Sequence, residues 1–324
     1  MTTRFIRAVV TAVLGASALS AWAQQGTSWP THTVRWIVPF AAGGTADATA
    51  RHIAEKLSQR WGQQVMIDNK PGGHTLIAAV DAARAAPDGY TLFQAINSTL
   101  TINQSTFSKL PYDPLRDFTH IGVIASVPLI FVANDTLPAK TMQEFIALAR
   151  SRPDTVTVGG GSVGMQLQAE RFMRDAGVKF RFIPYKSGAD VTKGLLSGEI
   201  QAGIDGVPAY PPLFKAGKLR LQATNSPKRI SSLPQVPTLV ELGLKNSEAP
   251  VWHGLVAPAG LPEAIRKKIA ADLQVVLKMP DLQERMAALG LEATWADADE
   301  FVKLIRSEAA NMEPLVKDLG IKMQ

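Results

Sequence analysis

The chain has 324 residues, of which 46% are hydrophobic and 19% are charged, and its formal net charge is +6 at pH 7. The lysines and arginines are scattered rather than clustered, which argues against binding to nucleic acid or to an anionic membrane surface. The chain has no cysteine, so disulfides, thiolate catalysis and cysteine-ligated zinc are excluded. The five histidines lack the spacing of a catalytic metal site, so neither a metal nor a cofactor is expected.

The first 23 residues have the pattern of a secretory signal peptide. Arg4 and Arg7 supply a short positive segment, and an apolar, small-residue stretch follows from 9 to 19. That stretch is shorter than the roughly 18 to 20 residues needed to span a bilayer. A small-x-small pattern ends at Ala23, so cleavage is expected after this residue. The mature protein is therefore expected to be exported to the periplasm.

Strand and helix patterns alternate along the rest of the chain. In the first block, β-rich runs at 34–38, 65–68 and 90–96 alternate with helical periodicity at 46–61 and 75–85. A second block has expected strands at 129–132, 156–158, 180–184, 202–205 and 219–224, separated by helices at 141–150, 165–176 and 189–196. The chain is expected to close with a strand at 252–257 and helices at 262–278, 280–288 and 297–319.

This alternation predicts an α/β fold with two lobes, each a mostly parallel sheet flanked by helices. About 300 mature residues also suit two domains better than one. The expected division places 29–127 and 250–324 in lobe one, and 128–249 in lobe two. The chain would then cross twice between the lobes, which is the connection expected of a hinge.

A glycine loop joins a strand to a helix in each lobe. The first loop contains Phe40, Gly43, Gly44, Thr45 and Asp47, and the second contains Gly160, Gly161, Ser162 and Gly164. Loops at the carboxyl ends of parallel strands face the ligand crevice, and the following helix presents unpaired N–H groups and a partial positive charge. Together they could hold a carboxylate without arginine. Alternatively, the glycines merely permit tight turns. Neither loop has a dinucleotide or P-loop pattern.

The second loop also allows a different function. Its residues 160–164 match the GxSxG nucleophile elbow, which lies between a strand and a helix. Ser162, then Asp190 or Asp205, then His253 would give the chain order of a serine hydrolase triad. Against this alternative, the elbow falls within a glycine run that offers little strain, and His253 lies in a strand-like segment.

Several segments in order resemble the Bug-type extracytoplasmic solute-binding receptors of tripartite tricarboxylate transporters, over about residues 30 to 321. They are Ile37-Val38-Pro39-Phe40 with Gly43-Gly44 and Asp47, Asn69-Lys70-Pro71-Gly72, Ala86 to Leu92, Leu110 to Pro114, Pro184-Tyr185-Lys186, Leu233-Pro234 with Val236-Pro237-Thr238, and Trp252 with Gly254-Leu255 and Ala257 to Gly260. The resemblance implies a two-lobed periplasmic-binding-protein, or Venus flytrap, architecture without catalysis. It also implies a small carboxylate ligand held by the two glycine loops, and the membrane subunits of such a transporter as partners of a monomeric receptor.

Other candidate ligand contacts remain open between a binding and a structural role. Asp47 either caps the first helix or recognises a ligand hydroxyl, amine or water, and Asp205 presents the same choice. The family often has Gly-Gly-Asn where this chain has His74-Thr75-Leu76, and a histidine where this chain has Met165 or Gln166. His74 and Gln166 therefore either tune specificity or fill space. Ser98 and Thr99 follow the third strand and are expected at the rim of the site. These departures leave the identity of the carboxylate open.

Overall fold

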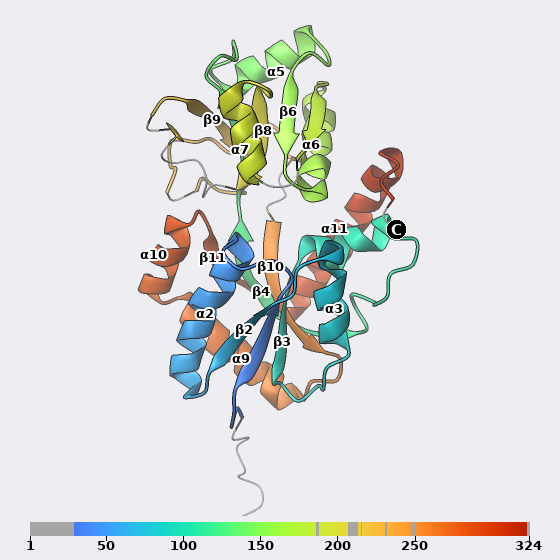
Figure 1. Ribbon diagram of the computed structural model, residues 1–324, viewed down its shortest axis with the longest axis vertical. Helices are drawn as coiled ribbons and strands as arrows, with labels where there is room; N and C mark the ends of the chain where they lie inside the picture. Colours follow the sequence, from blue (N-terminus) through green and yellow to red (C-terminus); the bar gives the residue numbers. More distant parts are fainter. Residues whose placement is uncertain are drawn as a thin grey trace, which may run out of the picture.

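The computed structural model describes residues 29–185, 188–206, 213–214, 216–230, 232–247 and 251–322. The expected signal peptide and Lys186 lie outside these residues. The chain forms two sheets, each flanked by helices, one above the other (Figure 1). This arrangement confirms the predicted two-lobed α/β fold. None of the helices in the described ranges is both long and apolar enough to cross a bilayer.

The first lobe contains a six-stranded sheet in the order β11-β4-β10-β3-β1-β2. Its strands are β1 (Val34–Val38), β2 (Val65–Asn69), β3 (Thr91–Ile96), β4 (Phe118–Val127), β10 (Val251–Pro258) and β11 (Glu292–Ala296). Its helices are α2 (Thr45–Trp61), α3 (Leu76–Ala83), α4 (Asn103–Thr106), α9 (Glu263–Leu277), α10 (Pro280–Ala288) and α11 (Ala298–Asp318), and two single turns occur at Gly73–Thr75 and Ser98–Ile102.

The second lobe contains a five-stranded sheet in the order β7-β6-β8-β5-β9. Its strands are β5 (Leu129–Asn134), β6 (Thr157–Gly160), β7 (Arg181–Pro184), β8 (Ala202–Gly206) and β9 (Leu219–Thr224). Its helices are α5 (Met142–Ser151), α6 (Val163–Ala176) and α7 (Gly188–Ser197). These bounds confirm the expected elements of the second block to within about two residues.

Both sheets are mixed rather than mostly parallel, and the crossings between lobes are the reason. In the first sheet β1 pairs in parallel with β2 and β3, whereas β10 is antiparallel to both β3 and β4. In the second, β6 is parallel to β7 and β8, whereas β5 is antiparallel to β8 and β9. Strand β4 carries the chain into β5 of the second lobe and β10 brings it back, so these strands must run in opposite directions.

The strand directions bring the two glycine loops together. Strands β1 to β3 run the same way as β4, toward the second lobe, and β6 to β8 run opposite to β5, toward the first lobe. The carboxyl ends of both sets therefore face the boundary between the lobes (Figure 1). In open α/β sheets, ligands bind at these ends.

Strands β4 and β11 and the turn at Ser98–Ile102 were not expected from the sequence. Strand β4 is buried along nearly all of its length and is separated from β5 only by Pro128. The segment therefore lacks the alternation of apolar and polar residues that would have marked β4 as a separate strand. Strand β11 is five half-buried residues at the edge of the sheet, too short for an alternation pattern.

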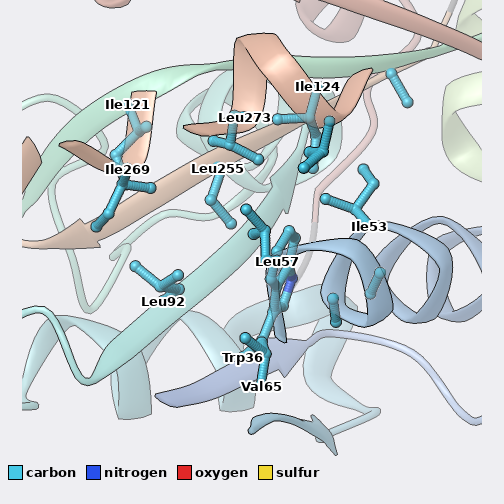
Figure 2. Close-up of a cluster of buried hydrophobic side chains, with 14 of the residues drawn as sticks. Trp36, Ile53, Leu57, Val65, Leu92, Ile121, Ile124, Leu255, Ile269 and Leu273 are labelled. Carbon is cyan, nitrogen blue, oxygen red and sulfur yellow. The ribbon is translucent and has the colours of Figure 1, made fainter. Parts of the chain in front are cut away.

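The core of the first lobe fixes the position of α2. Ile53 and Leu57 on the apolar face of α2 pack against Trp36 of β1, with Leu92 and Leu255 from the neighbouring strands (Figure 2). All five side chains are fully buried, and each buried Leu or Ile stabilises the fold by about 1.5 to 3 kcal/mol. This packing holds the amino terminus of α2 at the end of β1, at the boundary between the lobes.

Candidate ligand-binding site

A cavity of about 970 Å³ lies between the lobes, where the carboxyl ends of the two sheets meet. Its wall in the first lobe includes the predicted residues Phe40, Gly43, Gly44, Thr45, His74 and Ser98. Its wall in the second lobe includes Gly161, Ser162, Gly164, Gln166 and Asp205. The structure therefore brings most of the predicted ligand contacts from both glycine loops to one cavity. Three predicted residues, Asp47, Thr99 and Gly160, are not part of its wall.

The first glycine loop opens the start of α2 to the cavity. Gly44 is the N-cap residue, with φ −85° and ψ 176°, and Thr45 begins the helix. A Cβ atom on Gly44 would meet nothing closer than the carbonyl oxygen of Ala41 at 4.0 Å, so the approach to the helix start is open. Gly43 has φ 92°, a conformation that favours glycine. The first N–H groups of a helix have no partner within it and attract anions.

Asp47 supports this loop from behind. Its Oδ2 accepts hydrogen bonds from the backbone N–H of Gly43 and from Arg51 Nε, both at 2.9 Å, and its Oδ1 accepts one from Asn69 Nδ2 at 3.0 Å. Burial alone would raise the pKa of Asp47, but hydrogen bonds from Arg51, Gly43 and Asn69 outweigh it and lower the pKa. The carboxylate is therefore engaged within the loop, which corresponds to the structural alternative for this residue.

The second glycine loop opens the start of α6 to the same cavity. Ser162 is the N-cap, with extended backbone, and its Oγ accepts a hydrogen bond from Met165 N at 3.3 Å. A hydroxyl that accepts in this way can still donate its own proton to a ligand. Gly164 and Gln166 follow on the first turn of the helix and also line the cavity. Two helix starts, one from each lobe, thus open on a single space.

The glycines before Ser162 have a different role. Gly159 and Gly160 lie inside strand β6, not in the loop. A Cβ on Gly160 would lie 2.7 Å from Phe182 Cζ and 2.9 Å from Met165 Cβ, and one on Gly159 would collide with Ile200. These positions are glycine because neighbouring side chains pack directly onto the strand.

Thr99 is buried beneath the cavity wall rather than in it. Its Oγ1 donates a hydrogen bond to Thr75 Oγ1 at 2.9 Å, and its side chain has no exposed surface. Thr75, which was not expected at the site, does line the cavity, as do Asn97, Asn103, Tyr185 and His253. Asn97 and Tyr185 directly follow β3 and β7, so the strand-end rule could have found them. Asn103 follows the unexpected turn at Ser98–Ile102, and no sequence signal indicated it.

Asp205 lies in the cavity wall at the end of β8. Its Oδ1 accepts a hydrogen bond from the backbone N–H of Gly206 at 2.7 Å. Its carboxylate also lies so close to Gly188 that a Cβ there would collide with it. Gly188 is the first residue of α7, and a helix start favours a negative charge. This position stabilises the acidic side chain in the cavity wall.

The part of the wall that the structure describes contains no lysine or arginine. Its two histidines are His74 and His253. His253 is buried in β10 with Nδ1 3.2 Å from Thr49 Oγ1, and burial lowers its pKa to about 4, so it is neutral at pH 7. A serine hydrolase requires a hydrogen bond between the serine and the histidine. Here His253 contacts Thr49, and Ser162 Oγ caps α6 instead. An anion in this cavity would be held by main-chain dipoles and neutral donors.

Comparison with known proteins identifies the family. Residues 49–321 match the family described as "Tripartite tricarboxylate transporter family receptor". The protein BugT of Bordetella pertussis is 30% identical over 300 residues, covering 92% of each chain. The solved structure of R. palustris Rpa4515 with adipate has a TM-score of 0.79 and 32% identity, over 91% of this chain and 99% of that chain. The structure of MatC from Rhodopseudomonas palustris with bound malate has a TM-score of 0.73 and 29% identity, over 89% of this chain and 100% of that chain.

These matches decide between the two functions that the GxSxG pattern left open. The matching family consists of transporter receptors, and the two similar structures each contain a bound solute. Both kinds of match cover nearly the whole described chain. The hydrolase alternative is therefore set aside. The chain belongs to the tripartite tricarboxylate transporter receptor family, as a Bug-type solute-binding receptor and not an enzyme.

Proposed function

We propose that this receptor captures a small carboxylate between its lobes in the periplasm and delivers it to the membrane subunits of a tripartite tricarboxylate-type transporter. In this proposal the signal peptide is cleaved after Ala23 and the mature chain acts as a monomer. Lobe one comprises 29–127 and 250–324, and lobe two comprises 128–249. The ligand is held by the glycine loops, and Ser98, His74, Gln166 and Asp205 complete its surroundings.

The observation that carries the proposal is the convergence of two helix starts on one cavity. The N-cap residues Gly44 and Ser162 come from different lobes and both line the space of about 970 Å³. One helix start stabilises an anion by about 0.3 to 1 kcal/mol when exposed and by up to about 2 kcal/mol when partly buried. Two of them, in a wall whose described residues include no lysine or arginine, favour a carboxylate over a phosphate-rich ligand.

The similar proteins support the same ligand class. Rpa4515 was solved with adipate and MatC with malate, and both are carboxylates. A ligand that contacts both lobes binds the closed form better than the open form, so it shifts the population toward closure. Closure excludes water and strengthens each hydrogen bond to the carboxylate. The membrane subunits would then recognise the closed shape.

A binding experiment on the mature protein tests the proposal. A thermal-shift screen of small carboxylates that includes adipate and malate should find a ligand that raises the melting temperature and is not turned over. Isothermal titration then compares two variants with the wild type. Gly44→Pro removes one N–H donor at a φ of −85°, close to the range that proline adopts, and Ser162→Ala removes one hydroxyl. Both are expected to weaken binding about tenfold.

Thr141→Ala is the matched control for Ser162→Ala. Thr141 is also a helix N-cap of the second lobe, since its Oγ1 accepts from Glu144 N at 3.2 Å, but it does not line the cavity. Each N-cap replacement should cost about 1 kcal/mol of stability. Only Ser162→Ala should weaken ligand binding. If neither Gly44→Pro nor Ser162→Ala weakens the best ligand, the site lies elsewhere.

A further inference from the structure

The turn that leads into α3 has four consecutive residues with positive φ. They are Gly72 (116°), Gly73 (55°), His74 (51°) and Thr75 (77°). Glycine adopts this region at no cost, but the side chains of His74 and Thr75 are unfavourable there, and a β-branched residue such as threonine is a rare outlier. The chain thus holds two strained residues side by side, and both line the cavity between the lobes.

A buried hydrogen-bond network holds these two residues in place. Asn103 Nδ2 donates to the backbone oxygen of His74 at 2.9 Å, and Thr99 Oγ1 donates to Thr75 Oγ1 at 2.9 Å. Tyr112 OH donates to the backbone oxygen of Thr99 at 2.6 Å and lies 3.2 Å from Asn103 Nδ2. Asn103, Thr99 and Tyr112 are all at most 5% exposed. Strained backbone persists only where its surroundings fix it in this way, and it is concentrated at functional sites.

The effect of the strained turn is to bring an imidazole to the cavity wall. The His74 and Phe107 rings pack in a T-shaped arrangement with ring centroids 6.2 Å apart, and His74 lines the cavity on the side of the first lobe. The described part of the wall has no lysine or arginine, and the other histidine, His253, is buried. His74 is therefore the accessible imidazole in the described part of this wall, and a ring N–H can donate a hydrogen bond to an anion.

From these observations we infer that His74 is a specificity-determining residue that binds a second carboxylate of the ligand, while the two helix starts hold the first. Thr75, Thr99, Asn103 and Tyr112 act as positioning residues for the strained turn. The inference rests on the proposed function, because it assumes a carboxylate in this cavity. It adds a residue that distinguishes dicarboxylates from monocarboxylates, and a reason why the chain retains an unfavourable backbone.

The test compares dicarboxylates with monocarboxylates of matching length. Isothermal titration of the mature protein uses succinate, malate and adipate beside butyrate and hexanoate, with wild type, His74→Ala and His74→Gly. Both variants should bind the best dicarboxylate about tenfold more weakly and the matching monocarboxylate within twofold of wild type. His74→Gly should also melt about 1 to 3 °C higher than His74→Ala, because glycine relieves the strain that alanine keeps.

Each outcome bears on a different claim. If dicarboxylates bind and His74→Ala leaves their affinity and their preference over monocarboxylates unchanged, His74 has no role in specificity and the inference is overturned, while the proposed function stands. If His74→Gly melts no higher than His74→Ala, the turn is not strained, and the hydrogen-bond network does not hold His74 in an unfavourable conformation. If no member of the panel binds the wild type, both the proposed function and the inference are wrong for these carboxylates.

Discussion

Glu308 and Trp252 join the last long helix to the strand that returns from the second lobe. Glu308 Oε2 accepts a hydrogen bond from Trp252 Nε1 at 3.0 Å and lies 3.2 Å from Thr101 Oγ1. The Thr101 hydroxyl donates its proton to the backbone oxygen of Asn97 at 2.6 Å, so a protonated Glu308 can donate to Thr101 in turn. Burial raises the pKa of Glu308 to about 7, although the hydrogen bond from Trp252, the contact with Thr101 and the charge of Arg171 on α6 each act to lower it.

The raised pKa of Glu308 predicts a loss of stability as the pH rises. The folded protein retains a proton on Glu308 that the unfolded chain, with a pKa of 4.5, releases earlier, so stability falls between about pH 4.5 and 7. Chemical denaturation of wild type and Glu308→Gln should show this. The free energy of unfolding of the variant minus that of wild type should rise by about 2 to 3 kcal/mol from pH 5 to pH 8. A difference that does not change with pH would mean that Glu308 titrates normally.

The lowered pKa of His253 predicts that the stability of the protein falls as the pH is lowered. Burial lowers its pKa from 6.5 to about 4, so the unfolded chain binds a proton in this window that the folded chain excludes. Stability is therefore present above pH 6.5 and is lost as the pH falls toward 4. His253→Gln keeps a polar side chain beside Thr49 without this titration. Between pH 7 and pH 4.5, wild type should lose about 2 kcal/mol more than the variant, and parallel curves would contradict the assignment.

Helix α11 also contacts α6 of the second lobe, through an apolar cluster and an ion pair. Leu167 of α6 is fully buried among Ile102, Met312, Leu315 and Val316 of the first lobe. Leu167→Ala should therefore lower the free energy of unfolding by about 2 to 5 kcal/mol.

The ion pair beside this cluster provides the matched comparison. Arg174 and Asp318 lie 3.1 Å apart with side chains that are 44% and 57% exposed, so Arg174→Ala should cost less than about 1 kcal/mol. Urea denaturation of both variants measures the two costs. Equal costs would show that apolar packing is not what holds α6 to α11.

Gly160 and Gly44 are glycines for different reasons, close packing at Gly160 and an open approach to the cavity at Gly44. Gly160→Ala places a methyl group against Phe182 and should destabilise the fold by about 1 to 3 kcal/mol. Gly44→Ala places a methyl group in open space and should change stability by less than about 1 kcal/mol, yet it should weaken carboxylate binding because it narrows the approach to the start of α2. Thermal denaturation and isothermal titration on both variants separate the two effects, and a destabilised Gly44→Ala would contradict the open approach.

The sequence predicted the elements around the site well because strong local signals mark them. Thr141, where the helix at 141–150 was expected to begin, is the N-cap that accepts the hydrogen bond from Glu144 N, and strand 219–224 has the predicted bounds. Both glycine loops lie between a strand and a helix, as predicted from a local glycine run, but Gly160 belongs to strand β6 and not to the second loop. The mixed strand order was not predicted, since it depends on how the crossings orient β5 and β10.

The side chains around the cavity were harder to predict than the loops. Asp47 and Thr99 fall next to lining residues in the sequence, but their partners, Arg51 and Asn69 for Asp47 and Thr75 for Thr99, are set by tertiary packing. The strain at His74 and Thr75 could not be predicted either, because propensity alone argues against positive φ at both residues.

A crystal structure of the mature protein with its best-binding carboxylate tests the central claim most directly. We predict a carboxylate oxygen within about 3 Å of a backbone N–H at the start of α2, with the ligand also contacting Ser162 at the start of α6. The second lobe offers a competing position, a groove of about 600 Å³ beside α5 and α6 that Arg150, Arg174 and Lys179 line. A ligand bound in that groove, with the cavity between the lobes empty, would contradict the account.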